Sequence, residues 1–340
     1  MKGIQFSGPK KITVSDFDIP EPGKGEVLIK IKSSTICGSD MHVYRGEKVS
    51  WSIDLSIIPG HEPCGVVEEA GEGIDNLKKG DRVLVYHFEG CGNCSYCLEG
   101  NYQNCKSLRV YGGDKNGGDA EYMTAKARCC LKLPDELSFI DGSLLACNVG
   151  TCFEALKQLN ISALHTVVIY GLGPFGLAAL MILKAMGSFV IGVDIVDEKI
   201  KLANDFGAEF AINSLKVNAV KEIMEFTKGK GADAVIECSG SPEAIRDSLD
   251  CLRPYGKVAL VGVGLDDLIL RPLEQILLKQ SRIIGIRMFN IRTYPEMVEF
   301  VVKHKIPLEK IVTHRFNIED AQKAFDLFNT GKTGKIAFTF

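Results

Sequence analysis

The stretch Thr166-Val-Val-Ile-Tyr-Gly-Leu-Gly-Pro-Phe-Gly176 decides the fold of this 340-residue chain. A strand-like run leads directly into a Gly-x-Gly-x-x-Gly turn and then into a helical run at residues 177–186. A second strand-like run, residues 189–193, ends in Asp194, which stands 18 residues after the last glycine. The glycine pattern alone is a weak signal. A strand before it, a helix after it and an acid at this distance are together typical of a dinucleotide-binding βαβ unit, rather than of an ordinary strand-to-helix turn.

In such a unit the pyrophosphate of the dinucleotide lies on the N-terminus of the helix, and the glycines allow the backbone to approach it closely. Asp194 is predicted to hydrogen-bond the adenosine ribose hydroxyls and to repel a 2′-phosphate, which favours NAD over NADP. The cofactor-binding residues predicted in the turn are Gly171, Gly173, Pro174, Phe175 and Gly176.

Further strand-like runs follow at residues 210–213, 234–238 and 257–262, and each ends near small or polar residues. Val263, directly after the last of them, is a further predicted cofactor contact. Because ligands of open α/β sheets bind at the carboxyl ends of the strands, the pattern predicts a doubly wound parallel sheet. Residues 149–285 are therefore predicted to form an α/β nucleotide-binding domain.

Residues 1–148 have a different pattern, in which short β-type runs alternate with Pro and Gly breaks. Examples are residues 27–32, 66–68 and 82–86. This spacing favours a β-rich, barrel-like domain. The segment 286–340 has helical runs at 293–303 and 318–329, the run Val312-Thr-His-Arg-Phe316 between them, and a strand-like run at 335–340. It is expected to return to that first domain.

Four cysteines cluster in the run Cys91-Gly-Asn-Cys94-Ser-Tyr-Cys97, which Cys105 completes. Two-residue gaps let successive thiolates converge on one ion, and a fourth thiolate closes a tetrahedral shell. Such a Cys₄ set predicts a structural zinc site, and an iron–sulfur cluster is the alternative. The metal is expected to hold together a lobe, residues 90–106, that has few apolar residues of its own.

Composition places this chain among packed globular proteins: 46% of its residues are hydrophobic and 24% are charged. A net charge of −3 without a basic block argues against nucleic acid as the main partner. The N-terminus lacks the pattern of a signal peptide, and the apolar run near residues 177–183 is too short to cross a bilayer, so a cytoplasmic protein without membrane contact is expected. Six of the twelve cysteines are expected to be small buried side chains, namely Cys64, Cys129, Cys130, Cys152, Cys238 and Cys251.

A second set of metal donors is spread over three segments. The run Thr35-Ile-Cys-Gly-Ser-Asp-Met-His42 contributes Cys37, with Asp40 as a residue that could orient a ligand from behind. His61 and Glu62 are adjacent, and Cys147 follows much later. Cys, His, Glu and Cys are the donors of an open zinc site, in which one position stays free for a reactant.

Taken together, these motifs resemble the zinc-dependent medium-chain alcohol dehydrogenases over essentially the whole chain. The matching elements are residues 37–42, 60–62, 91–105, 171–176 with Asp194, and 312–316. The resemblance implies a GroES-like catalytic domain beside a Rossmann domain, one catalytic and one structural zinc, and NAD as hydride acceptor. The chain looks most like the polyol, sugar-alcohol and threonine dehydrogenase branch.

The resemblance assigns Cys37 and His61 to the family's zinc ligands. Glu62 matches a carboxylate that binds zinc in some members and stands behind it in others. The family's fourth position falls on Cys147, where polyol-type members carry a Glu-Pro pair. This departure leaves two ligand sets open, Cys-His-Cys or Cys-His-Glu with water.

The same resemblance implies that Ser39 touches the substrate alcohol and that His42 ends a proton relay, which runs from Ser39 across a cofactor ribose hydroxyl. A relay is needed because water must be excluded from the closed site. Thr151 is implied to pack against the nicotinamide, and Lys199 to approach the adenosine ribose.

Family alignment also places His87 in the wall of the substrate pocket, with Trp51, Tyr44 and Asn290 as further candidates. A polar wall suits a hydroxylated substrate, so a secondary alcohol of a polyol, sugar acid or cyclitol is expected. An amino alcohol such as threonine is the rival substrate, and a non-enzymatic zinc- and NAD-binding redox sensor is a distant alternative. A homodimer or homotetramer is expected, through pairing of residues 257–262 and the segment to Met288.

Overall fold

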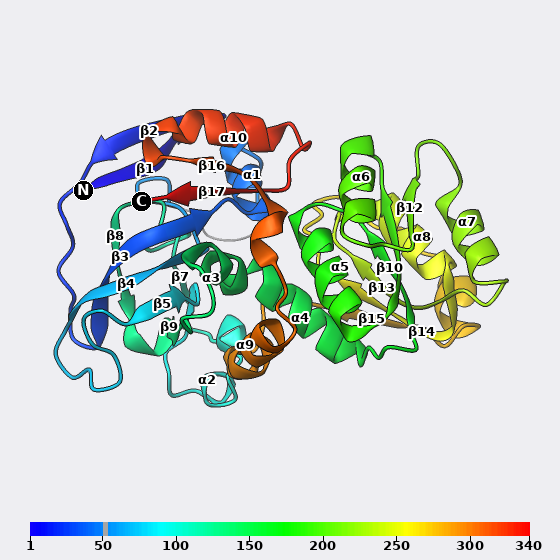
Figure 1. Ribbon diagram of the computed structural model, residues 1–340, viewed down its shortest axis with the longest axis horizontal. Coiled ribbons are helices and arrows are strands. Elements are labelled where there is room, and N and C mark those ends of the chain that lie inside the picture. The colour runs from blue at the N-terminus through cyan, green and yellow to red at the C-terminus, as the bar shows by residue number, and fades with distance from the viewer. Residues whose placement is uncertain (50–53) are drawn as a thin grey trace. The chain divides into compact units, whose positions relative to one another are not determined.

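The computed structural model describes residues 1–49 and 54–340, so Trp51 lies outside the described part of the chain. The chain forms two compact units (Figure 1). The first unit consists of residues 1–150, 289–302 and 308–340, and the second of residues 151–288 and 303–307. No helix among the described residues is long and apolar enough to cross a membrane.

The second unit contains a six-stranded sheet whose neighbours all run parallel. Its strands lie in the order β12-β11-β10-β13-β14-β15, which is the doubly wound order with a switch point between β10 and β13. This arrangement confirms the fold predicted from the glycine turn. The strands are β10 (Thr166–Tyr170), β11 (Phe189–Asp194), β12 (Phe210–Asn213), β13 (Ala232–Glu237), β14 (Leu252–Leu260) and β15 (Arg282–Gly285).

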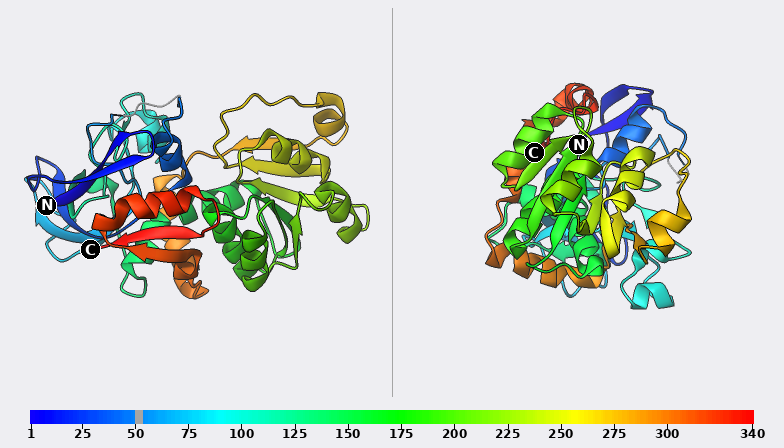
Figure 2. Two further views of the ribbon diagram at one scale, coloured as in Figure 1. Left: turned by 90° about the horizontal axis from the view of Figure 1, so that it is seen from above. Right: turned by 90° about the vertical axis from the view of Figure 1, so that its right-hand side faces the viewer.

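Helices cover both faces of this sheet, as right-handed crossovers require. The helices α5 and α6 pack against each other and against β11, whereas α7 and α8 form the second pair, with α8 against β13 and β14 (Figures 1 and 2). The sheet's apolar side chains, among them Val168, Ile191 and Val235, are fully buried between the layers. The helices are α5 (Pro174–Met186), α6 (Asp197–Asp205), α7 (Ala219–Phe226) and α8 (Pro242–Asp250), and a π-helical turn, η3, spans Leu273–Leu277.

The first unit is built around the long strand β3 (Glu26–Thr35). One edge of β3 pairs with β4, and the other edge pairs first with β8 and then with β17, all antiparallel. Val27, Ile29 and Ile31 alternate along β3 and are fully buried in the core of this seven-stranded sheet. The other strands are β4 (Pro63–Ala70), β5 (Arg82–Val85), β8 (Tyr122–Lys126), β9 (Cys130–Lys132), β16 (Val312–Phe316) and β17 (Lys335–Thr339).

Two smaller antiparallel pairs, β1–β2 and β6–β7, complete the strands of this unit. A second core forms where α10 and β17 meet β1, and it includes Phe6, Phe325 and Phe338. The remaining elements of the first unit are β1 (Lys2–Gly8), β2 (Lys11–Asp16), β6 (Phe88–Glu89), β7 (Arg109–Val110), α1 (Gly38–Tyr44), α2 (Ser95–Leu98), η1 (Tyr102–Asn104), η2 (Ala127–Cys129), α3 (Phe139–Ala146), η4 (Ile291–Thr293), α9 (Tyr294–Lys303), η5 (Leu308–Ile311), η6 (Ile318–Asp320) and α10 (Ala321–Asn329). The helix α4 (Asn148–Leu159) belongs mostly to the second unit.

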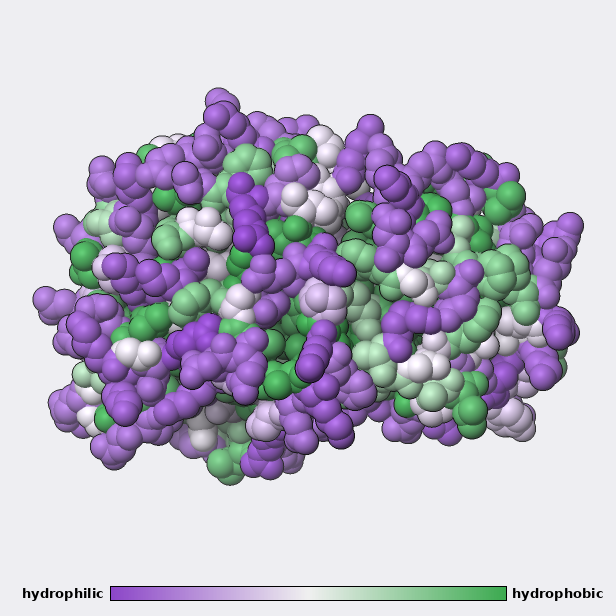
Figure 3. All heavy atoms as spheres, viewed as in Figure 1, coloured by the Kyte–Doolittle hydropathy of each residue, from purple (hydrophilic) through white to green (hydrophobic). Residues whose placement is uncertain are grey.

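Hydrophilic side chains cover most of the face seen in Figure 3, with apolar side chains scattered among them. The exposed large apolar side chains of the second unit include Leu265, Ile269, Leu277 and Ile283, at or before the edge strand β15.

The six cysteines outside the predicted ligand sets behave as expected in five cases, since Cys64, Cys129, Cys130, Cys152 and Cys251 are buried. Cys238 is only partly buried.

Candidate metal and cofactor sites

The structure brings together the four donors predicted for the open metal site. Ligand atoms of Cys37, His61, Glu62 and Cys147 all lie within 4.8 Å of one another, and the four residues are buried. Cys37 stands between the end of β3 and the start of α1, and His61 and Glu62 directly precede β4. Cys147 sits at the break between α3 and α4, where a φ of −143° and a ψ of −60° interrupt the helical path.

Asp40 holds two of these donors in place. Its Oδ1 lies 3.0 Å from Nδ1 of His61, and its Oδ2 accepts a hydrogen bond of 2.8 Å from the backbone N–H of Cys37. The contact with Nδ1 directs Nε2 of His61 toward the donor cluster, which is the usual way in which a carboxylate orients a metal-binding imidazole. The geometry therefore supports the orienting position expected for Asp40.

Lys335 is a buried partner of this cluster that sequence analysis missed. It lies at the start of β17, is fully buried, and places Nζ 2.9 Å from Oε1 and 2.6 Å from Oε2 of Glu62. Oγ1 of Thr35 donates a short hydrogen bond to Oε2 of the same carboxylate. A single lysine at the head of the apolar run Ile336–Phe338 was the only hint in the sequence.

The donor cluster fits a zinc ion. A hydrogen bond from Cys147, with the nearby charges of Lys335 and His61, holds the pKa of the Cys37 thiol well below its usual range despite burial. Burial opposes a charged His61, but Asp40 and Cys37 outweigh it and raise the pKa of that imidazole. The pocket therefore carries thiolate character and attracts a cation, as expected of a site built from sulfur and imidazole donors.

Ser39 and His42 both lie on α1, the short helix that begins directly after Cys37. Ser39 is partly buried in the first turn, and the side chain of His42 is 16% exposed in the last turn. Nδ1 of His42 makes a short contact with Oε2 of Glu47. The two predicted relay residues therefore lie on the helix that follows Cys37, the first residue of the donor cluster.

The four cysteines of the predicted structural site also converge. The Sγ atoms of Cys91, Cys94, Cys97 and Cys105 lie within 4.8 Å of one another. Backbone N–H groups of Asn93 and Cys94 lower the pKa of the Cys91 thiol to about 6, so that a thiolate is available for a metal. The set contains no other donor type, and it fits a closed Cys₄ zinc site.

Each glycine of the Gly-x-Gly-x-x-Gly turn has its own structural task. Gly171 adopts a φ of +87°, which favours glycine, directly after β10. At Gly176 an added Cβ would stand 2.0 Å from the carbonyl oxygen of Gly171, so only glycine fits there. At Gly173 an added Cβ would meet only Nζ of Lys199, at 3.9 Å. This open side of Gly173, at the N-terminus of α5, is where a pyrophosphate can approach the backbone.

Asp194, at the end of β11, is tied to the same turn. Its Oδ2 accepts a hydrogen bond of 2.7 Å from the N–H of Leu172 and lies 3.8 Å from Nζ of Lys199. Its Oδ1 accepts from the N–H groups of Ile195 and Val196. The acid and the glycine turn are therefore held as one structure, and Lys199 lies beside them.

The remaining predicted cofactor contacts lie in the second unit. Thr151 is buried, and its Oγ1 lies 3.7 Å from Sδ of Met288. Pro174 and Phe175 form the first turn of α5 and are partly buried. Val263 is 46% exposed in the loop after β14, packed against the loop at Gly240.

The tight contact at Gly176 leads to a first testable prediction. Gly176→Ala is expected to weaken NADH binding at least about 10-fold and to lower the stability of the protein by about 1–3 kcal/mol, because the new methyl group displaces the turn. Gly173→Ala is the matched variant: it should weaken NADH binding to a similar degree, because it crowds the pyrophosphate, but leave stability unchanged. Fluorescence titration and thermal unfolding measure the two effects. Wild-type NADH affinity in Gly176→Ala would contradict this assignment.

Of the residues considered for the wall of the substrate pocket, His87 lies beside the donor cluster of Cys37, His61, Glu62 and Cys147. Its ring packs edge-on against His61, with 4.8 Å between the ring centroids, and the residue is buried. Tyr44 is instead fully buried in the core and donates to Oδ1 of Asp326. The amide of Asn290 is engaged with Glu99 and Asn101 of the cysteine lobe. Tyr44 and Asn290 are therefore held by structural contacts.

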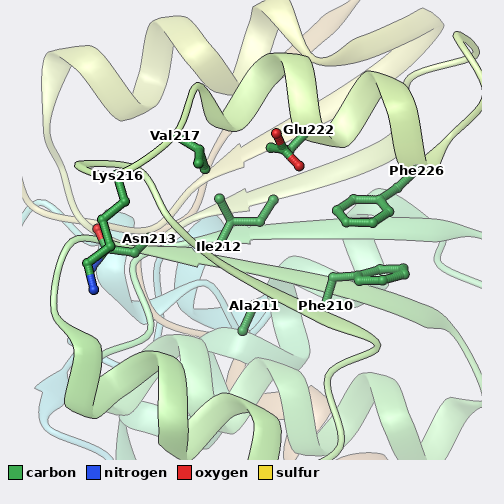
Figure 4. Close-up of a pocket in the computed structure, with 8 residues that line it drawn as sticks. All are labelled: Phe210, Ala211, Ile212, Asn213, Lys216, Val217, Glu222 and Phe226. Atoms are coloured by element: carbon green, nitrogen blue, oxygen red, sulfur yellow. The ribbon is translucent and has the colours of Figure 1, made fainter.

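A pocket of about 300 Å³ lies elsewhere, between β12 and α7 of the second unit (Figure 4). The stacked rings of Phe210 and Phe226, 3.6 Å apart between centroids, form its apolar end. None of its lining residues is among the predicted site residues, and Glu222 is its only carboxylate. The chemistry expected of this chain does not belong to this pocket.

Two protein families match this chain, and together they cover parts of both units. The alcohol dehydrogenase GroES-like domain family matches residues 23–135, and the zinc-binding dehydrogenase family matches residues 174–303. The chain is 33% identical to L-threonine 3-dehydrogenase of Pyrococcus horikoshii, over 95% of this chain and 93% of that protein. It is 31% identical to D-arabitol-phosphate dehydrogenase of Enterococcus avium, over 98% of this chain and 96% of that protein.

A solved structure extends the likeness to the whole fold. The alcohol dehydrogenase rspB of Escherichia coli CFT073, complexed with NADH, superimposes with a TM-score of 0.90 and 28% identity. The match covers 100% of this chain and 99% of that chain. With its two donor clusters and its dinucleotide turn, this chain belongs to the zinc-dependent medium-chain alcohol dehydrogenase family, and its own sites fit zinc and NAD.

Proposed function

We propose that this protein oxidises a secondary hydroxyl group of a polyol, sugar acid or cyclitol, and reduces the corresponding ketone, with NAD as the redox partner. The observation that carries the proposal is the buried cluster of Cys37, His61, Glu62 and Cys147 beside the polar ring of His87. A buried polar wall rejects substrates that leave its groups unpaired, so it favours a hydroxylated substrate over a simple alcohol.

Within this proposal Cys37, His61 and Cys147 bind the catalytic zinc. Glu62 stands behind it, because both of its oxygens are already engaged by Lys335 and Thr35. Zinc when bound supplies Lewis acidity for the alcohol oxygen, and NAD supplies the hydride acceptor. Asp40 keeps the imidazole of His61 in the orientation that binding needs.

The chain's own groups handle the proton. Ser39 receives the proton of the substrate hydroxyl at Oγ, and His42, at the other end of α1, releases it to solvent. A histidine suits this task because its charge changes near neutral pH. The partial exposure of His42, 16% for its side chain, supports an exit to water at this end of the helix.

The second unit holds the dinucleotide in this proposal. The open backbone at Gly173 and the N-terminus of α5 accept the pyrophosphate, and Asp194 with Lys199 faces the adenosine ribose. A carboxylate at Asp194 repels a 2′-phosphate, so we propose NAD rather than NADP. The relative crystallised with NADH supports this choice.

Two substrate classes are supported by relatives. The likeness to a D-arabitol-phosphate dehydrogenase supports the polyol proposal, and the likeness to L-threonine 3-dehydrogenases supports an amino alcohol as the second candidate. Both have a secondary hydroxyl group next to a carbon that bears a polar group. The same residues and the same proton path would serve either one.

The experiment is to follow NADH formation by the zinc-loaded protein against polyols, aldonic acids, inositols and threonine. NADP⁺ in place of NAD⁺, and protein treated with a chelator, are the controls. We expect one polyol-type substrate to be turned over with NAD⁺, and chelation to stop the reaction. Threonine as the best substrate would replace the polyol class by the amino-alcohol class. Preference for ethanol over every polyol and threonine would contradict both.

We also propose a homodimer or homotetramer and a cytoplasmic location. The exposed apolar side chains at and before the edge strand β15 support pairing between copies of the chain. None of the twelve cysteines forms a disulfide, which supports a reducing compartment.

A further inference from the structure

The proposed end of the proton path, His42, has a carboxylate partner that lies outside the predicted site. Nδ1 of His42 makes a short contact with Oε2 of Glu47, five residues further along the chain. The side chains are 16% and 35% exposed, so the pair lies at the border between protein and solvent. An ion pair at such a position adds little to stability. We therefore expect the contact between His42 and Glu47 to act mainly on the protonation and orientation of the imidazole.

The local fold brings Glu47 to this position. Helix α1 ends at Tyr44, and Gly46 follows with a φ of +72°. The N–H of Gly46 donates to the carbonyl of Val43, and the N–H of Glu47 donates to the carbonyl of His42. The N–O distance is 2.9 Å in both bonds. These two bonds and the left-handed glycine define a Schellman motif, which turns the chain back over the last turn of the helix.

The turn is also fixed from outside. Pro9, in the turn between β1 and β2, packs so closely that a Cβ added at Gly46 would stand 2.9 Å from its Cγ. In the same turn, the N–H of Lys10 donates a hydrogen bond of 2.5 Å to the carbonyl of Tyr44. The β1–β2 hairpin therefore holds the end of α1 and the segment that carries Glu47. The contact between His42 and Glu47 is a product of this local architecture.

The chemistry of the contact selects one form of the imidazole. The hydrogen bond with His42 lowers the pKa of the Glu47 carboxyl, so Glu47 is an ionised group that can only accept. Nδ1 of His42 must then carry the hydrogen of the contact. In the neutral ring this leaves the lone pair on Nε2, and Nε2 becomes the nitrogen that can take a proton.

One other charged side chain that contacts this pair is that of Arg45. Nη1 of Arg45 lies 3.6 Å from Oε1 of Glu47, while its Nε donates to Asn329. Charged side chains on α1 and on the elements packed against it are paired elsewhere: Asp40 with His61, Asp326 with Tyr44, Lys323 with Asp320 and Lys2 with Glu319. Glu47 is an acidic group in direct contact with His42.

We propose that Glu47 is a positioning residue of the proton path, which fixes His42 with Nε2 as its proton acceptor and stabilises the imidazolium that forms when the proton arrives. This inference rests on the proposed role of His42. Glu47 touches neither substrate nor cofactor in this account, and it acts through the imidazole alone.

The test compares four variants of the zinc-loaded protein in NAD⁺-dependent oxidation of its best substrate across pH. Glu47→Gln removes the charge, and its amide can donate to Nδ1 and so hold the wrong tautomer. Glu47→Asp keeps the charge with a shorter reach. His42→Gln removes the imidazole. Glu68→Gln is the matched control, because it removes the charge of a partly exposed glutamate on β4 that pairs with Lys79.

For Glu47→Gln we expect the plateau of kcat to fall about 10-fold, with KM for the alcohol unchanged. This loss is smaller than the roughly 10²–10⁴-fold contribution of general acid–base catalysis, because His42 itself is retained. The acidic limb of the profile should change as well, because the imidazolium that forms has lost its anionic partner. Glu47→Asp should keep the limb in place and recover part of kcat. Glu68→Gln should match the wild type.

Two outcomes overturn the inference, and they differ in what else they remove. A loss of activity in His42→Gln with a wild-type profile in Glu47→Gln would leave the proposed function standing and reject the role of Glu47. Full activity in His42→Gln would reject the proton path itself, and the inference with it. Thermal unfolding of each variant, with a midpoint near that of the wild type, ensures that folded proteins are compared.

Discussion

Replacing Cys37 with serine is expected to lower kcat for alcohol oxidation by about 10³-fold or more, while the protein stays folded. The loss follows from the donor set: a serine hydroxyl is a poor zinc ligand, and a metal that acts as Lewis acid contributes several kcal/mol to the reaction. Serine keeps the backbone N–H that donates to Asp40, so the orientation of His61 is expected to survive. Steady-state NADH formation and the zinc content of the purified variant measure the effect.

The matched control for this variant is Cys64→Ser. Cys64 is also a fully buried cysteine of the first unit, but its Sγ donates to the carbonyl of Val83 and belongs to neither donor cluster. A serine hydroxyl can make the same bond, so we expect activity within a few-fold of the wild type. Equal activity of Cys37→Ser and Cys64→Ser would remove Cys37 from the proposed metal site.

Replacing Lys335 with methionine is expected to lower the free energy of unfolding by about 3–5 kcal/mol. Among the contacts described for the fully buried carboxylate of Glu62, the change removes the ion pair and keeps the hydrogen bond from Thr35. Removing one member of a buried ion pair is costly because the other charge is left unpaired. Burial already raises the pKa of Glu62 to about 7 in the presence of Lys335. Urea unfolding followed by circular dichroism measures the loss.

Two further variants separate the buried pair from ordinary charge removal. Lys132→Met breaks an exposed pair with Asp81, 3.1 Å long, and should cost less than about 1 kcal/mol. The double variant Lys335→Met with Glu62→Gln should regain most of the lost stability, because neither member of this pair is left with an unpaired charge. A Lys335→Met protein as stable as Lys132→Met would show that this ion pair does not hold the region together.

Much of the fold was predictable because its signals are local. The buried strand before Gly171 and the acid at Asp194 lie within one βαβ unit, and β10 and β12 match the predicted ranges to the residue. The helix α3 was missed, although Ser138 and Asp141 form a capping box at its start. Its residues are nearly all buried, so the run lacks the apolar and polar alternation from which a helix is predicted.

The candidate site was predictable where its residues are chemically distinctive. Cysteine and histidine at ligand-like spacing in the sequence point to Cys37, His61 and Cys147. Lys335 was not predictable, because its partner Glu62 lies 273 residues away and only the pairing of β3 with β17 brings the two regions together. Glu47 was missed for a different reason: its contact depends on the left-handed Gly46, and the sequence shows only an ordinary loop.

The most direct test of the central claim is to measure zinc per chain and NAD⁺-dependent turnover of the same sample while a chelator removes the metal. We expect two zinc ions per chain at the start, and turnover that falls in proportion to the loss of the first. The second ion, enclosed by Cys91, Cys94, Cys97 and Cys105, should leave more slowly. Undiminished turnover after complete removal of zinc would contradict the account.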